Sequence, residues 1–232
     1  MSDKGSSFTV GHRERLKAKF LNDKLADYEL LELLLTYAIP RRDVKPLAHK
    51  LIRHFGGVYF VFTAPIEKLM ECDGVGRTTA ILIKLVQNLM LINHRYDAQT
   101  KKIYHNPEAF IEYIRLKLTV LDHEELHVYY LGADFTLVHE ELHTRGSVDE
   151  SPIYQVQILK QALNLSAKSI VLAHNHPTTS NSFSTPDIEM THNLEIYLNM
   201  SGISLYDHFV VSGGIVHSMR ELGVLNKSSS DK

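Results

Sequence analysis

Apolar side chains in the first hundred residues recur every three or four positions, which is the spacing of amphipathic helices. The segments with this spacing, each bounded by proline, glycine or acidic residues, are residues 27–35, 44–55, 65–70 and about 80–94. Residues 1–10 are mostly polar and lack the pattern, so we expect a flexible N-terminus there. The pattern as a whole predicts a small all-α domain over residues 11–97.

The spacing of apolar residues changes in the second half of the chain. Residues 98–106 are polar and weakly patterned, which indicates a linker, and residues 107–121 have helical spacing again. Further on, strands are predicted at residues 126–131, 136–142, 169–173, 209–212 and 215–217, and helices at 153–165 and 186–200. The sequence therefore predicts a mixed α/β domain over residues 107–226, followed by a polar tail at residues 227–232.

The two predicted domains differ in the sign of their charge, although the whole chain carries only −2. Residues 1–96 contain 15 Lys and Arg against 10 Asp and Glu, whereas residues 97–232 contain 10 against 17. This distribution indicates two units with different partners, with chance scatter as the alternative. The mild positive excess of the first domain is compatible with a surface that faces nucleic acid.

Cysteine content and hydropathy indicate a cytoplasmic protein. The single cysteine, Cys72, excludes an internal disulfide and a thiolate zinc site, and it suits a reducing compartment. The first ten residues lack the apolar core of a secretory signal, and no apolar stretch approaches the length of a membrane span. We therefore expect a cytoplasmic protein with no membrane partner.

The strongest chemical signal is a His-x-His pair at the end of the predicted strand 169–173. Side chains two residues apart in an extended segment point the same way, so His174 and His176 can offer imidazoles to one ion. After ten intervening residues, Asp187 falls in the first turn of the next predicted helix. Three protein ligands leave one tetrahedral position for water, as catalytic zinc sites require. The alternative is chance, because 14 histidines make an accidental pair unremarkable.

These residues resemble the signature of the JAMM (MPN+) metalloproteases, in which a serine, here Ser184, lies three residues before the aspartate. Within that group the chain is similar to the RadC family over about residues 10–225. The resemblance implies a cytidine-deaminase-like JAMM/MPN fold, with a mixed sheet and flanking helices. It also implies a Zn²⁺-dependent metallopeptidase or isopeptidase-like hydrolase that acts on a protein or peptide substrate.

The sequence departs from the family pattern at one place. The family usually follows the His-Pro dipeptide with Ser-Gly, whereas residues 178–183 read Thr-Thr-Ser-Asn-Ser-Phe. The length of the loop is kept, but the glycine is lost. The shape of this loop, and the substrate that it admits, therefore do not follow from the resemblance.

The resemblance further implies roles for residues around the metal. A zinc-bound water attacks an amide carbonyl, and a glutamate just before the first strand of the catalytic domain acts as general base. The family spacing selects Glu124, with Glu125 as the alternative. Ser184 donates a hydrogen bond to the developing oxyanion, or serves as a helix cap, or both. Asp207 and His208 are candidates to support the ligating histidines, with a strand-start pair unrelated to the metal as the alternative.

A Gly-x-Gly turn in the first domain suggests contact with DNA. Gly74-Val75-Gly76 lies between two helical segments and looks like a helix-hairpin-helix, whose N–H groups at the following helix start can hold a phosphate. Arg77 and Lys84 would add positive charge, and such contacts would be independent of base sequence. A plain connection between helices is the alternative.

Two rival functions remain open from the sequence. The first is a DNA-binding scaffold, associated with DNA repair, that uses the N-terminal domain; the intact ligand set argues against it. The second is a metal-dependent nuclease, which is less favoured because the ββα nuclease motif spreads its residues along the chain instead of placing them in a row. The sequence predicts neither the identity of the substrate nor the oligomeric state.

Overall fold

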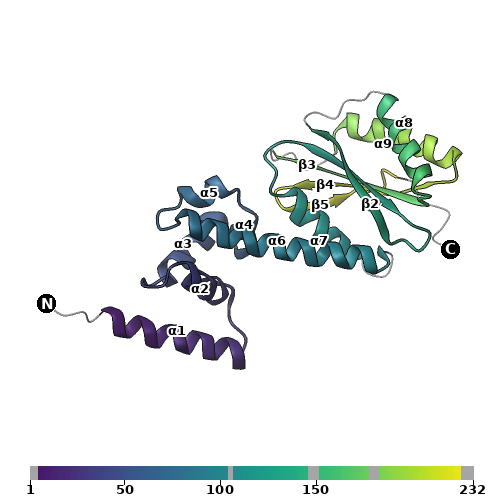
Figure 1. The fold of residues 1–232 in the computed structure, drawn as a ribbon. Coiled ribbons are helices and arrows are strands. Elements are labelled where there is room, and N and C mark those ends of the chain that lie inside the picture. Colours follow the sequence, from purple (N-terminus) through teal and green to yellow (C-terminus); the bar gives the residue numbers. More distant parts are fainter. Residues whose placement is uncertain (1–4, 104–106, 146–151, 178–182, 226–232) are drawn as a thin grey trace. The chain divides into compact units, whose positions relative to one another are not determined.

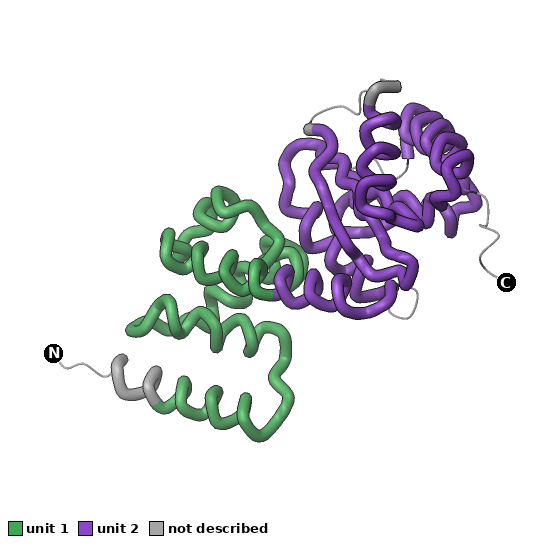
Figure 2. The backbone as a smooth tube through the Cα atoms, turned by 45° about the vertical axis from the view of Figure 1, so that its right-hand side comes forward, with its two compact units in different colours: residues 1–89 green, residues 90–232 purple. Residues whose placement is uncertain are grey.

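The computed structural model describes residues 5–103, 107–145, 152–177 and 183–225 (Figure 1). The chain divides into two compact units, residues 1–89 and 90–232 (Figure 2). The first unit is helical and the second is built on a sheet. Within the described ranges, no helix combines the length and the apolar character that crossing a membrane requires.

The first unit contains the helices that the apolar spacing predicts and two more, one before them and one between the second and the third. Its helices are α1 (Gly5–Asn22), α2 (Asp27–Ala38), α3 (Lys45–Phe55), α4 (Val58–Thr63), α5 (Ile66–Glu71) and the first part of α6 (Arg77–Thr100). The larger core of the unit is formed by the inner faces of α2 to α6, with the fully buried side chains of Leu31, Leu35, Ala48, Leu51, Val61, Leu69, Ala80 and Ile83. The unit is therefore all-α, as expected.

Two boundaries differ from the sequence-based expectation. Helix α1 begins at Gly5, so residues 5–10, which were expected to be flexible, belong to a helix. Once the first turn of a helix has formed, each added residue contributes one more hydrogen bond. Helix α6 continues through Thr100, and Ala98 and Ile103 are buried in the core of the second unit. Residues 98–103 are therefore not an exposed linker, because their few apolar side chains find a core. Residues 1–4, 104–106, 146–151, 178–182 and 226–232 lie outside the described ranges, and so does all but the last residue of the loop at residues 178–183.

The second unit is built on a five-stranded mixed sheet with the order β2-β1-β3-β4-β5. The strands are β1 (Glu125–Leu131), β2 (Leu137–Arg145), β3 (Ser169–His176), β4 (Ser204–Ser212) and β5 (Ile215–Ser218). Strand β3 is antiparallel to β1 and parallel to β4. It occupies the centre of the sheet, as its apolar, β-branched sequence predicts.

Helices cover both faces of this sheet (Figure 1). Helices α8 (Pro152–Asn164) and α9 (Thr185–Met200) pack on one face, over Val128, Ile170 and Leu172. Helix α7 (Pro107–Leu118) packs on the other, over Tyr129 and Val171. Alternate residues of β3 therefore enter different layers, and this alternation decides which side chains share the candidate site.

Candidate metal centre

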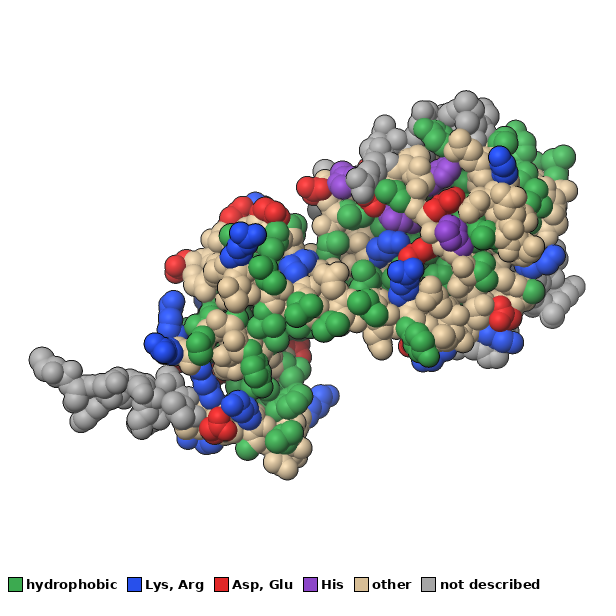
Figure 3. All heavy atoms as spheres, viewed as in Figure 1, with side chains coloured by type: hydrophobic (Ala, Val, Ile, Leu, Met, Phe, Trp, Pro, Cys, Tyr) green, Lys and Arg blue, Asp and Glu red, His purple; other side chains and the backbone are tan. Residues whose placement is uncertain are grey.

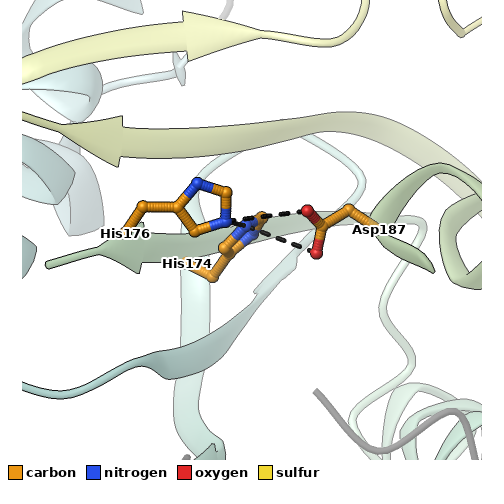
Figure 4. Close-up of side chains that lie close together, drawn as sticks. All are labelled: His174, His176 and Asp187. Carbon is orange, nitrogen blue, oxygen red and sulfur yellow. Dashed lines mark hydrogen bonds and ion pairs between the residues drawn. The ribbon is translucent and has the colours of Figure 1, made fainter. Parts of the chain in front are cut away.

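Strand β3 carries two histidines at its carboxyl-terminal end. His174 and His176 are alternate residues of the strand, so both lie on the sheet face that α8 and α9 cover. Helix α9 starts beside this strand end and places Asp187 in its first turn. Figure 4 shows the Asp187 carboxylate pointing toward the two imidazole rings. The three side chains that the sequence indicates thus meet in one place.

The donor atoms are spaced as one small metal ion requires. The Nε2 atoms of His174 and His176 lie 3.0 Å apart, and they lie 3.5 and 3.6 Å from the nearer oxygens of Asp187. Two nitrogens bound at about 2.0–2.1 Å to a tetrahedral zinc ion are about 3.3 Å apart. The three donor atoms all lie within 4.8 Å of one another. This group could therefore hold a metal ion.

Ser184 orients the Asp187 carboxylate. The Ser184 hydroxyl and backbone N–H both donate to Asp187 Oδ2, at 2.6 and 2.7 Å, and the Asp187 N–H donates back to Ser184 Oγ at 3.2 Å. This capping box fixes the start of α9. Burial alone would raise the pKa of Asp187, but His174 and the hydrogen bonds from Ser184 hold that pKa well below its usual range. The carboxylate is therefore ionised, which is the form that binds a cation.

A chain of hydrogen bonds fixes the orientation of the His174 ring. The Thr191 hydroxyl donates to the Asp187 carbonyl at 2.5 Å, so its oxygen is left to accept from His208 Nδ1–H at 2.7 Å. His208 Nε2 then carries the lone pair that accepts from His174 Nδ1–H at 2.8 Å. Burial lowers the pKa of His208 well below its ordinary value, which keeps the ring neutral. His174 is thereby held with its Nε2 toward Asp187, and this nitrogen is the one that would bind a metal ion.

Replacing Thr191 by valine should weaken metal binding about 10- to 100-fold, because His208 loses the acceptor that sets its tautomer. Thr191→Ser keeps the hydroxyl and should bind the metal as the wild type does. Competition with a chromophoric chelator gives the affinity of each protein. Equal affinities in all three proteins would show that this chain of hydrogen bonds does not tune the site.

The sequence indicated His208 but not Thr191. Thr191 lies one helical turn after Asp187, so the i+4 spacing of two polar residues on the inner face of α9 was a visible signal. Its pairing with His208 depends on the register of β3 and β4, in which Leu172 lies beside His208. That register is a long-range feature that local patterns do not contain.

Asp207 does not join this chain of hydrogen bonds, contrary to the expectation that it supports the ligands. As the neighbour of His208 in β4, it lies on the opposite face of the sheet. Its carboxylate accepts from Ser218 Oγ at 2.5 Å and from the backbone N–H groups of His208 and Arg220 at 2.7 and 3.1 Å. Burial raises the pKa of Asp207 despite these bonds. Asp207 therefore ties β4 to the end of β5.

The two candidate general bases have different surroundings. Glu125 is the first residue of β1, and its carboxylate oxygens lie 2.9 Å from His123 Nε2 and 2.8 Å from His127 Nε2. His127 stacks on Tyr129 in the layer beneath α7, so the Glu125 side chain faces away from the three candidate ligands. Glu124 precedes the strand and is half-buried. Glu125 is therefore engaged by two histidines in the layer beneath α7, whereas Glu124 lies half-buried before the strand.

The glycine turn of the first unit leads into α6, and of its three residues Gly76 is exposed, Gly74 is half-buried and Val75 is buried. Gly74 adopts φ = 100°, a left-handed conformation that favours glycine, and a Cβ at Gly76 would meet no atom within 4 Å. Arg77 is exposed, whereas Lys84 Nζ donates to two backbone carbonyls at the end of α4, at 3.2 and 3.0 Å. Burial lowers the pKa of Lys84 to about 8. Lys84 therefore caps a helix and does not extend a phosphate-binding surface, contrary to expectation.

Comparison with known proteins places the chain in a family. The family model described as "RadC-like JAB domain" matches residues 104–224. A UPF0758 protein of Fusobacterium nucleatum is 36% identical over 235 residues, covering 97% of this chain and 100% of the relative. A UPF0758 protein of Ruegeria pomeroyi is 34% identical over 222 residues, covering 94% and 99%. With the sheet, the flanking helices and the His-His-Asp group in agreement, the chain belongs to the family of RadC-like JAB-domain proteins.

Proposed function

We propose that this protein is a zinc-dependent metallopeptidase or isopeptidase-like hydrolase that acts on a protein or peptide substrate. At the family level, the RadC-like JAB domain and the His-His-Asp group support a JAMM-type metal-dependent hydrolase. The observation that carries the finer proposal is the convergence of His174, His176 and Asp187. Two imidazoles and a carboxylate suit zinc, and three protein ligands leave a fourth tetrahedral position for catalysis.

The metal and the side chains of the protein would have separate roles in this reaction. A zinc ion supplies Lewis acidity, which lowers the pKa of water toward about 7 and polarises a carbonyl group. Glu124 accepts the proton of the attacking water and returns it to the leaving amine. Ser184, which already touches Asp187, turns its hydroxyl hydrogen toward the substrate oxygen as negative charge develops there.

The register of the sheet supports Glu124 as the base. Leu126 pairs with His174 in the antiparallel β1–β3 ladder, so the same count places Glu124 opposite His176. Alternation then gives Glu124 the sheet face of Leu126 and the metal ligands, and gives Glu125 the other face. Glu124 therefore shares a sheet face with the candidate ligands, whereas Glu125 is held by two histidines in the other layer.

A substrate screen tests this proposal against the nuclease alternative. The zinc-loaded protein is incubated with a peptide library, with lysine isopeptides and with single- and double-stranded DNA under identical conditions. We expect amide cleavage that a chelator abolishes and that Asp187→Ala lacks. Metal-dependent cleavage of DNA while all peptides stay intact would instead support a nuclease.

The open start of α6 favours an additional role in sequence-independent DNA contact, and we propose it as a second function. Gly76 and Arg77 are exposed at the start of this helix, where the first N–H groups have no acceptor within the helix. In Figure 3, the Lys and Arg side chains on the visible face of this unit are scattered rather than gathered into one patch. The proposed contact is therefore small and strongly dependent on salt.

Replacing Arg77 by glutamate should weaken duplex DNA binding several-fold at low salt and reduce the slope of affinity against salt concentration by about 1. Lys160→Glu, an equal change of charge at an exposed position of α8, should have little effect. Fluorescence anisotropy titrations at several salt concentrations measure both quantities. Identical titrations for the wild type and both variants would rule out a specific contribution of this turn.

A further inference from the structure

Asn175 lies between the two histidine ligands in sequence but points to the other side of the sheet. It is 2% exposed, and its side-chain amide makes two hydrogen bonds to the segment that leads into β1. Asn175 Nδ2 donates to the His123 carbonyl at 2.8 Å, and Asn175 Oδ1 accepts from the Glu125 N–H at 2.9 Å. One planar side chain therefore holds two backbone groups of the neighbouring segment.

These two backbone groups flank Glu124. The His123 carbonyl belongs to the peptide plane before Glu124, and the Glu125 N–H belongs to the peptide plane after it. Because each peptide unit is planar, holding one atom of each plane restrains the φ and ψ angles of Glu124 and the direction of its Cα–Cβ bond. The amide of Asn175 thus sets where the Glu124 side chain can begin.

The backbone pairing of the sheet does not hold Glu124 in place. Strand β1 begins at Glu125, and its ladder with β3 begins at the pair of Leu126 and His174. Glu124 precedes both the strand and its ladder with β3, at a position where a segment without support would be free to move. The Asn175 side chain extends the connection between β1 and β3 beyond the last backbone pair. Asn175 lies between His174 and His176 in β3, so the same strand supports the two proposed ligands and the segment that contains Glu124.

We propose that Asn175 is a positioning residue that holds Glu124 at a fixed place relative to the metal ligands. This inference rests on the proposed function, in which Glu124 is the general base. The residue acts through the backbone of Glu124 and contacts neither metal nor substrate. Its loss leaves the ligands in place and displaces the base, and a displacement of about 1 Å can reduce catalysis about 10²-fold.

Asn175→Ala, analysed in the full-length protein, tests the inference. Hydrogen exchange at the Glu125 amide should become at least about tenfold faster, because its buried acceptor is gone. Zinc content should equal that of the wild type. For a peptide that the wild type cleaves in the substrate screen, kcat should fall roughly 10- to 100-fold with KM nearly unchanged.

A double-mutant cycle separates positioning from general damage to the fold. If Asn175 acts through Glu124, then Asn175→Ala should add no further loss of rate in a Glu124→Gln background. Ser169→Ala is the matched control, because Ser169 lies at the far end of β3 and also hydrogen-bonds the neighbouring strand, through its Oγ to Ser204. That control should leave the Glu125 amide exchange and the rate unchanged. Asn175→Ser, whose side chain is too short to hold both backbone groups, replaces the alanine variant if the latter does not fold.

The outcomes distinguish this inference from the proposed function. Unchanged exchange at the Glu125 amide, loss of zinc from Asn175→Ala, or an equal loss of rate in both backgrounds would overturn the positioning role. Absence of peptide cleavage by the zinc-loaded wild type would overturn the proposed function instead. In that case the exchange measurement still decides whether Asn175 holds the segment.

Discussion

Glu124→Gln should lower the rate of peptide cleavage by about 10²–10⁴ while leaving the metal in place. Glutamine keeps the size and hydrogen-bonding shape of the side chain but cannot accept the proton of the attacking water. Because Glu124 is not among the three metal ligands, zinc content should stay at the wild-type level. Single-turnover kinetics on a cleaved peptide, with elemental analysis of the same sample, measure both quantities.

Glu125→Gln is the matched control for this prediction. Its carboxylate lies between His123 and His127, in the layer beneath α7, so the substitution should disturb local packing and lower the free energy of unfolding. The cleavage rate should change far less than in Glu124→Gln. A larger loss of rate in Glu125→Gln than in Glu124→Gln would reverse the assignment of the base.

Zinc should raise the melting temperature of the metal-free α/β unit by roughly 10 °C. The ion binds the folded ligand set in preference to the dispersed ligands of the unfolded chain, so a free concentration of about 1,000 times Kd stabilises by about 4 kcal/mol. In a domain of this size, each kcal/mol shifts the melting temperature by roughly 2–4 °C. Differential scanning calorimetry follows the transition with and without the metal.

Asp187→Asn is the control for the thermal shift. The amide retains an oxygen for the Ser184 cap but loses the negative charge that binds the cation, so most of the zinc-dependent shift should disappear. A second variant, Asp187→Ala, should also melt lower without metal because it loses the capping box, a change of about 1 kcal/mol. A full zinc-dependent shift in both variants would mean that the ion stabilises the protein at another place.

The local pattern of the sequence was sufficient to predict that the three candidate ligands lie close together. Alternation along an apolar strand places His174 and His176 on one face, and the helix start after Ser184 places Asp187 beside them. Both are short-range features, visible within one strand, one loop and one helical turn. For the same reason, the helices of the first unit could be predicted from apolar spacing.

Features that depend on distant pairing could not be predicted in this way. The contacts of Thr191 with His208, and of Asn175 with the segment before β1, join residues 17 to 52 positions apart. Asp207 and His208 were treated as a pair, but β4 begins at Ser204 and sends them to opposite faces. The prediction of a linker did not hold for residues 98–103, because Ala98 and Ile103 pack into a core formed mostly by later residues.

The zinc content of the wild type, His174→Ala and Asp187→Ala tests the account most directly. Each protein is purified without chelator, incubated with zinc, freed of excess metal and analysed for zinc per chain, with circular dichroism to verify the fold. The account predicts about one zinc per chain in the wild type and almost none in either folded variant. A wild type that binds no zinc, or variants that bind as much as the wild type, would contradict it.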